Sequence, residues 1–255
     1  MTKQELIQKT IARKSDNPNG LAYINIDNEN KYRGWVADFG FRRKGDTENI
    51  KLNLHKEYDL FLLFFMASVW SRPGPFENAA FLIGALVGNN KIDDSIVNVV
   101  ARIRENFDIN QFEGRLVNEL RKKFSVRNDV IDSLKVLLKN WNDIYKKLNE
   151  NHTERDWRQF AVYMNSIQGL GYGNKAMLIK IPLILRELRC QKVFDNIPGK
   201  YCCVADSRVK EAFKKITDTN FYTGNIDNVL KVSEKIYADY GDLYDIPLFA
   251  YKDLM

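Results

Sequence analysis

The chain has 255 residues, of which 45% are hydrophobic and 28% charged, and its formal net charge is +6 at pH 7. This balance is that of an ordinary globular protein that is long enough to bury a substantial core. The positive charge favours an anionic partner without identifying one. The most apolar run, 60–69, is too short to cross a bilayer, so no membrane partner is expected.

Cysteine and histidine usage excludes two further classes of protein. The three cysteines, Cys190, Cys202 and Cys203, are too few and too poorly spaced for a disulfide framework, which favours the reducing cytoplasm. His55 and His152 have no partner at metal-ligand spacing. We therefore expect a cytoplasmic protein without a metal site, an iron–sulfur cluster or an organic cofactor.

The first 56 residues differ in pattern from the rest of the chain. Two short alternating runs, 21–26 and 32–41, flank the polar residues Asp27 to Asn30. Alternation on both sides of a polar turn predicts a short β-hairpin. We therefore expect an N-terminal segment, 1–56, packed on a helical core, 57–255.

From residue 57 onward, apolar residues recur at spacings of three and four, which is typical of α-helices. Helices are predicted from residue 57 to near residue 70 and over 76–87, 96–107, 112–124, 131–148, 157–164, 176–188, 209–216 and 226–240. Thr153 and Asp156 predict a capping box that opens the sixth of these helices. The predicted fold class is all-α.

Two short motifs carry the chemistry of the chain. Residues 167–176 place three alternating glycines, Gly169, Gly171 and Gly173, between two predicted helices, and Lys175 follows just inside the second helix. Such glycines let backbone N–H groups approach a phosphate at a helix N-terminus. Further along, Asp206 opens another helix in the sequence Val-Ala-Asp-Ser-Arg-Val. A lysine and an aspartate beside a clamp for the DNA backbone predict chemistry on a nucleotide.

Each motif also has a plainer interpretation. The glycines form a tight helix connection as readily as a phosphate cradle. Asp206 as a simple N-cap stabilises a helix by about 1 kcal/mol. Lys175 is less simply explained, because a cation near a helix N-terminus opposes the helix dipole. The same field lowers the pKa of that amine and favours its nucleophilic form.

Together the motifs resemble those of the helix-hairpin-helix DNA glycosylases, enzymes that excise damaged or modified bases. In the bifunctional members, a hairpin of the form Gly-h-Gly-x-Lys, where h is apolar, carries a lysine nucleophile, and an aspartate opens a later helix. Asp206 follows Lys175 by 31 residues. This long separation is similar to that of the archaeal 8-oxoguanine glycosylase/lyase branch.

The resemblance implies a two-lobed helix-hairpin-helix fold, with the hairpin at 167–177, that binds double-stranded DNA as a monomer. Lys175 would attack C1′ of a flipped nucleotide, 8-oxoguanine being the first candidate, and then form a Schiff base that leads to strand cleavage. Asp206 would stabilise the sugar cation and help to deprotonate Lys175. The implied DNA contacts are Gly169, Gly171, Tyr172, Gly173 and Arg208. Residues implied to act as a wedge in the base stack or to line the base pocket are Trp70, Arg72, Tyr251 and Asp253.

The glycines align with the family hairpin in two ways. Gly171-Tyr172-Gly173 places Lys175 at the nucleophile position, whereas Gly169-Leu170-Gly171 places Gly173 there. The second alignment favours a monofunctional glycosylase that removes an alkylated purine, or a modified cytosine of foreign DNA in a defence role. An alternative of another class is a non-catalytic helix-hairpin-helix module that only binds DNA.

Overall fold

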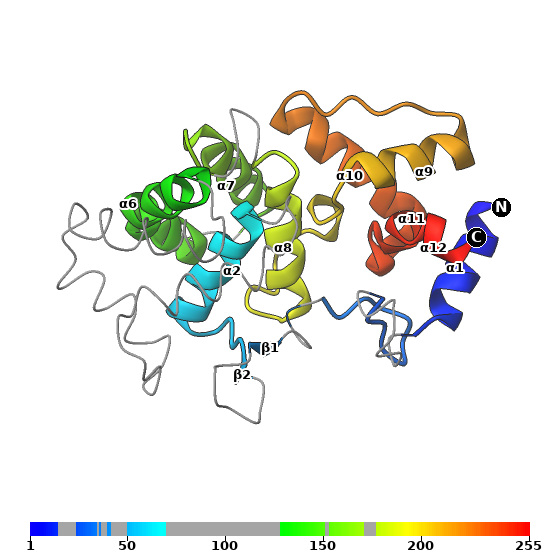
Figure 1. Ribbon diagram of the computed structural model, residues 1–255, viewed down its shortest axis with the longest axis horizontal. Coiled ribbons are helices and arrows are strands. Elements are labelled where there is room, and N and C mark those ends of the chain that lie inside the picture. Colours follow the sequence, from blue (N-terminus) through cyan, green and yellow to red (C-terminus); the bar gives the residue numbers. More distant parts are fainter. Residues whose placement is uncertain are drawn as a thin grey trace. The chain divides into compact units, whose positions relative to one another are not determined.

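In a computed structural model the described part of the chain is mostly helical, which is consistent with the predicted all-α class (Figure 1). The structure describes residues 1–14, 24–34, 36, 40–41, 50–69, 128–150, 153–170 and 177–255. The chain divides into two compact units. Unit 1 consists of Met1–Asp38, Asn151–Ser166 and Leu178–Met255, and unit 2 consists of Phe39–Glu150 and Ile167–Met177. The predicted N-terminal segment, 1–56, thus contributes residues to both units.

Unit 2 is built on α2 (Glu57–Val69) and α6 (Asn128–Glu150), which pack on each other. Both helices were predicted from their apolar spacing. Residues 60–68 of α2 are all buried, as expected of a helix that is apolar on every side. Trp141 of α6 lies edge-on to two phenylalanines of α2, with ring centroids 5.0 and 5.6 Å away. A short antiparallel pair, β1 (Gly40–Phe41) and β2 (Ile50–Lys51), belongs to the same unit.

The N-terminal part of unit 1 begins with α1 (Lys3–Ala12), which the sequence pattern did not predict. A capping box between Thr2 and Glu5 opens this helix. The predicted hairpin is represented by one antiparallel bridge between Ile26 and Tyr32, on either side of the polar turn. Residues 21–23, 35 and 37–39 of the two alternating runs lie outside the described residues.

The rest of unit 1 consists of short helices. In chain order they are α7 (Glu154–Ser166), α8 (Lys180–Cys190), η1 (Gly199–Tyr201), α9 (Ser207–Thr217), α10 (Ile226–Tyr240), η2 (Gly241–Leu243), α11 (Ile246–Phe249) and α12 (Tyr251–Leu254). The predicted capping box is present at α7, where Thr153 and Asp156 exchange hydrogen bonds. The chain ends meet in this unit, because α1 packs on α11 and α12 (Figure 1).

The start of α8 corrects the sequence prediction. The helix was expected from residue 176, but residues 177–179 form turns and α8 begins at Lys180. Pro182 explains the later start, because proline lacks an N–H group and fits only within the first turn of a helix. Lys180 therefore occupies the first position of the helix.

Several predicted features lie outside the described residues. They are the helices over 76–87, 96–107 and 112–124 and most of the glycine hairpin, 171–176. Of the helices that the structure does describe, none combines the length and the apolar character needed for a membrane span.

Candidate functional site

Helix α8 is buried along almost its whole length although it carries four charged side chains. Every residue from Lys180 to Leu188 is buried. Charged groups in a protein interior are normally paired, because removing an unpaired charge from water is costly. Arg186 and Glu187 follow this rule. Lys180 is only 5% exposed, yet it has no hydrogen-bond or ion-pair partner among the described residues. A buried lysine with no such partner among the described residues marks a candidate functional site.

Asp206 stands at the N-terminus of α9, as the sequence predicted. Its Oδ1 accepts a 2.9 Å hydrogen bond from the backbone N–H of Val209, which makes it the N-cap of the helix. No described residue donates a hydrogen bond to its second oxygen, Oδ2. The side chain is partly exposed. Asp206 thus caps α9 with one of its two carboxylate oxygens.

Lys180 and Asp206 interact electrostatically within unit 1. Burial lowers the pKa of Lys180 to about 8, and the Asp206 carboxylate opposes that shift. Burial disfavours the charged form of an amine, whereas a nearby carboxylate favours it. The site therefore combines a carboxylate with an amine that changes protonation state near pH 8. The sequence signal for Lys180 is a single charge inside the apolar run 176–185.

Lys180→Met is expected to stabilise the protein at neutral pH. The folded-state pKa of Lys180 is about 8, below its ordinary value of 10.5. The unfolded state therefore binds more protons between pH 8 and 10.5, and stability rises with pH across that window. Below the window both states are protonated, so methionine should raise the free energy of unfolding at pH 7 by up to about 3 kcal/mol.

Urea unfolding of the wild type and the variant at several pH values measures this effect. The variant should also lack the Lys180 contribution to the rise in stability at alkaline pH. Lys214→Met is the matched control, because this lysine lies exposed on α9, where substitutions change stability by less than about 0.5 kcal/mol. A Lys180→Met protein that is less stable than the wild type at pH 7 contradicts the expectation.

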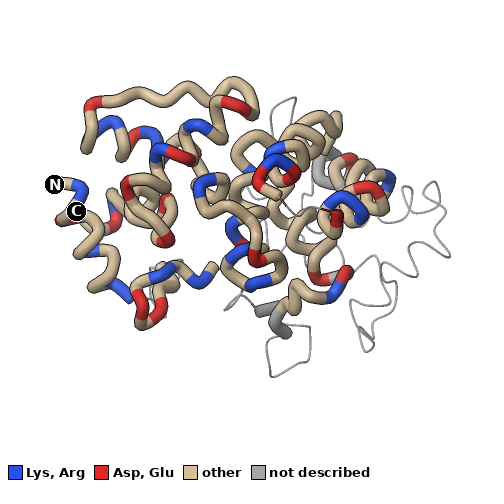
Figure 2. The backbone as a smooth tube through the Cα atoms, turned by 180° about the vertical axis from the view of Figure 1, so that it is seen from behind, with Lys and Arg blue, Asp and Glu red and all other residues tan. Residues whose placement is uncertain are grey.

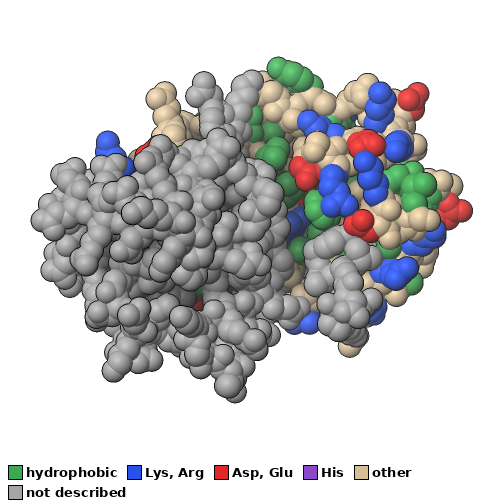
Figure 3. All heavy atoms as spheres, viewed as in Figure 1, with side chains coloured by type: hydrophobic (Ala, Val, Ile, Leu, Met, Phe, Trp, Pro, Cys, Tyr) green, Lys and Arg blue, Asp and Glu red, His purple; other side chains and the backbone are tan. Residues whose placement is uncertain are grey.

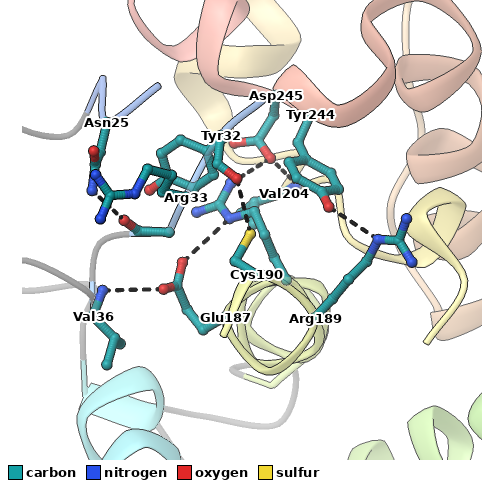
Figure 4. Close-up of polar contacts among 12 residues, drawn as sticks. Asn25, Tyr32, Arg33, Val36, Glu187, Arg189, Cys190, Val204, Tyr244 and Asp245 are labelled. Carbon is teal, nitrogen blue, oxygen red and sulfur yellow. Dashed lines mark hydrogen bonds and ion pairs between the residues drawn. The ribbon is translucent and has the colours of Figure 1, made fainter. Parts of the chain in front are cut away.

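A buried ion pair supports the segment that precedes Asp206. Nη1 of Arg186 lies 2.7 Å from Oδ1 of Asp245, and both side chains are almost fully buried. The same Oδ1 accepts a 2.7 Å hydrogen bond from the backbone N–H of Val204 (Figure 4). Burial raises the pKa of Asp245, although Arg186 and the Val204 N–H act to lower it.

The N-terminal segment of unit 1 contacts the other side of this cluster. Oε2 of Glu187 accepts a 3.1 Å hydrogen bond from the backbone N–H of Val36, and Cys190 donates one of 3.3 Å to the carbonyl of Tyr32 (Figure 4). Gly34 has a φ of +81°, and a Cβ at this position would lie 2.5 Å from Oε2 of Glu187. Position 34, where the N-terminal segment passes α8, therefore requires glycine.

Three further predicted site residues gather around the outer face of α9. Arg208 forms a 2.9 Å ion pair with Asp253 and stacks on the ring of Phe249, 4.4 Å from its centroid. Tyr251 is buried, with the Lys215 amine 5.9 Å from its ring centroid. A shallow depression is lined by Arg208, Glu211, Ala212, Lys215, Leu248, Phe249, Tyr251 and Lys252. Asp206 is not among its lining residues.

Charges of both signs surround this depression. Basic and acidic residues are interspersed along unit 1 (Figure 2), and their side chains share the surface over α9, α11 and α12 (Figure 3). Glu211 pairs with Lys215 at 3.2 Å and with Lys252 at 2.9 Å. Lys210 and Lys214, one helical turn apart on α9, have no acidic partner among the described residues.

The remaining predicted site residues divide between described and undescribed parts of the chain. Gly169 is exposed with a φ of +79°, a backbone conformation that favours glycine. The predicted residues that lie outside the described ranges are Trp70, Arg72, Gly171, Tyr172, Gly173 and Lys175. Within the described ranges, no group of three or more His, Cys, Asp or Glu side chains is arranged to hold a metal ion.

Comparison of the chain with protein-family models, with curated proteins and with solved structures gave no significant match.

Proposed function

We propose that this protein is a DNA glycosylase with abasic-site lyase activity, in which Asp206 is the catalytic carboxylate and Lys175 the nucleophile. Two features of the sequence support the proposal, the glycine-lysine motif at 167–176 and the aspartate that opens α9. The net charge of +6, and the two lysines of α9 that have no acidic partner among the described residues, suit a DNA partner, whose binding should weaken as salt rises.

The observation that carries the proposal is that the Asp206 carboxylate caps α9 and also acts electrostatically on the buried amine of Lys180. An aspartate that served only as an N-cap would need no buried lysine near it. Lys180 retains its position in the core although burial lowers its pKa to about 8, and Asp206 is the charge that opposes this shift. Such a costly arrangement is typical of functional sites. We assign Lys180 as the charge partner that orients Asp206.

In the proposed reaction the target nucleotide first leaves the base stack, because its C1′ is inaccessible inside a duplex. The neutral amine of Lys175 attacks C1′, the N-glycosidic bond breaks, and the base leaves with the electron pair and gains a proton. Asp206 stabilises the positive charge on the sugar and accepts the proton of the attacking amine. Ring opening gives a Schiff base, and loss of a C2′ proton expels the 3′ phosphate.

The test is to incubate the protein with duplexes that each carry one modified base, 8-oxoguanine first, and to resolve the products before and after alkali. Excision together with strand cleavage before alkali is the expected result. Cleavage that appears only after alkali would indicate a monofunctional glycosylase. Binding without excision on every duplex would indicate a non-catalytic DNA-binding module, for which the capping geometry of Asp206 alone is sufficient.

A further inference from the structure

The segment that carries Asp206 is fixed by its backbone. Residues 202–206 form no helix or strand, yet the N–H groups of residues 202–204 all donate hydrogen bonds. Their acceptors are the Gly199 carbonyl at 3.0 Å, Ser233 Oγ at 2.8 Å and Asp245 Oδ1 at 2.7 Å. The last acceptor is a buried carboxylate, and its donor, the N–H of Val204, is the nearest of the three donors to Asp206 in the chain.

The charge on Asp245 is held in place by α8. Arg186 pairs with it at 2.7 Å, and burial of both groups prevents water from replacing either partner. Oε1 of Glu187 lies 3.6 Å from Arg186 Nε, so the guanidinium is bracketed by two carboxylates. The Arg186 guanidinium also lies over the Tyr32 ring, 5.1 Å from its centroid. Arg186 and Asp245 therefore join three separate parts of unit 1 at the base of the Asp206 segment.

We propose that the Arg186–Asp245 pair is the positioning element of the Asp206 site: by holding the Val204 N–H, it sets where the Asp206 carboxylate stands relative to the Lys180 amine. The effect of this pair on catalysis rests on the proposed function. Its effect on the position of Asp206 can be measured without DNA. Asp245 touches no reacting atom and acts through Asp206.

The pKa of Lys180 provides a specific readout. Among the described residues, Asp206 is the charged group that raises this pKa against burial. Displacing Asp206 should therefore lower it, and we expect a change at Asp245 to reach Lys180 through Asp206. NMR titration of the Lys180 side chain, assigned with Lys180→Met, measures the value in the wild type and in each variant.

The main variant is the double substitution Arg186→Met with Asp245→Leu. It removes both charges together, which buried pairs tolerate far better than the loss of one partner. We expect the Lys180 pKa to fall below its wild-type value of about 8, because burial is then no longer opposed by Asp206. Asp206→Asn should lower it equally, and combining the changes should lower it no further, as expected for groups that act in series.

Two further variants separate positioning from a general loss of structure. Arg186→Met with Asp245→Asn keeps an oxygen for the Val204 N–H and should restore the Lys180 pKa to near 8. Asp227→Asn removes a carboxylate from the exposed 2.6 Å ion pair with Arg158 and should change nothing. On a duplex whose modified base the wild type excises, the double variant Arg186→Met with Asp245→Leu should have a kcat that is about tenfold to a hundredfold lower, with unchanged DNA affinity.

An unchanged Lys180 pKa in the folded main variant, or an effect that adds to that of Asp206→Asn, overturns the positioning role. Failure of the asparagine variant to restore the pKa also overturns it. Absence of excision by the wild type would instead overturn the proposed glycosylase function, and the titration would still decide whether Arg186 and Asp245 position Asp206.

Discussion

Asp206→Asn is expected to lower the rate of base excision by about a hundredfold or more while leaving DNA affinity unchanged or slightly higher. The carboxylate would stabilise positive charge that develops on the sugar, and removing one preorganised electrostatic group of this kind costs about a hundredfold to a thousandfold. DNA affinity should not fall, because the substitution removes a negative charge near the phosphates. Single-turnover excision and fluorescence anisotropy measure the two quantities.

Folding should not complicate this comparison, because asparagine caps helices about as well as aspartate. The chain itself offers the matched control. Asn225 caps α10 through a 2.9 Å hydrogen bond from the N–H of Asn228, so Asn225→Asp makes the reverse exchange at a second cap. That variant should excise at the wild-type rate. An Asp206→Asn protein that also excises at this rate would refute the mechanism and leave a capping role only.

Long helices with a regular apolar pattern were predictable from the sequence. The helices α2, α6, α7 and α10 follow directly from residues that recur at spacings of three and four. The helices α11 and α12 were missed because four residues make barely one turn and show no period. The start of α8 was misplaced because the apolar run hid the constraint that Pro182 imposes.

The candidate site was predictable only in part. Asp206 was identified because a capping aspartate before an apolar residue is a local pattern, readable within four positions of the chain. Arg186 and Asp245 carry no such signal, because 59 residues separate them and only the packing of α8 against the C-terminal helices pairs them. Burial of Lys180 is likewise a property of unit 1 as a whole. Both features depend on contacts between residues that are far apart in the sequence, and local sequence patterns do not reveal such contacts.

Burial also separates the roles of the two lysines in the proposal. Lys180 is 5% exposed, so its amine is poorly accessible to the sugar of a nucleotide. A nucleophile must approach C1′ to within about 3.5 Å before reaction. Lys180 is therefore suited to orienting a carboxylate rather than to forming a Schiff base. The covalent role remains with Lys175, which the sequence motif favours.

Reduction with borohydride in the presence of an abasic duplex should trap the protein covalently on DNA through Lys175. A Schiff base is the intermediate that borohydride reduces, so Lys175→Gln should abolish the adduct while DNA affinity falls only slightly, by the loss of one positive charge. Lys180→Gln is the matched control and should still be trapped, at a reduced rate, because its amine only orients Asp206. Peptide mapping of the wild-type adduct identifies the attached lysine directly. An adduct on Lys180 would reverse the two assignments, and the absence of any adduct alongside normal excision would mean that water, rather than an amine, attacks C1′.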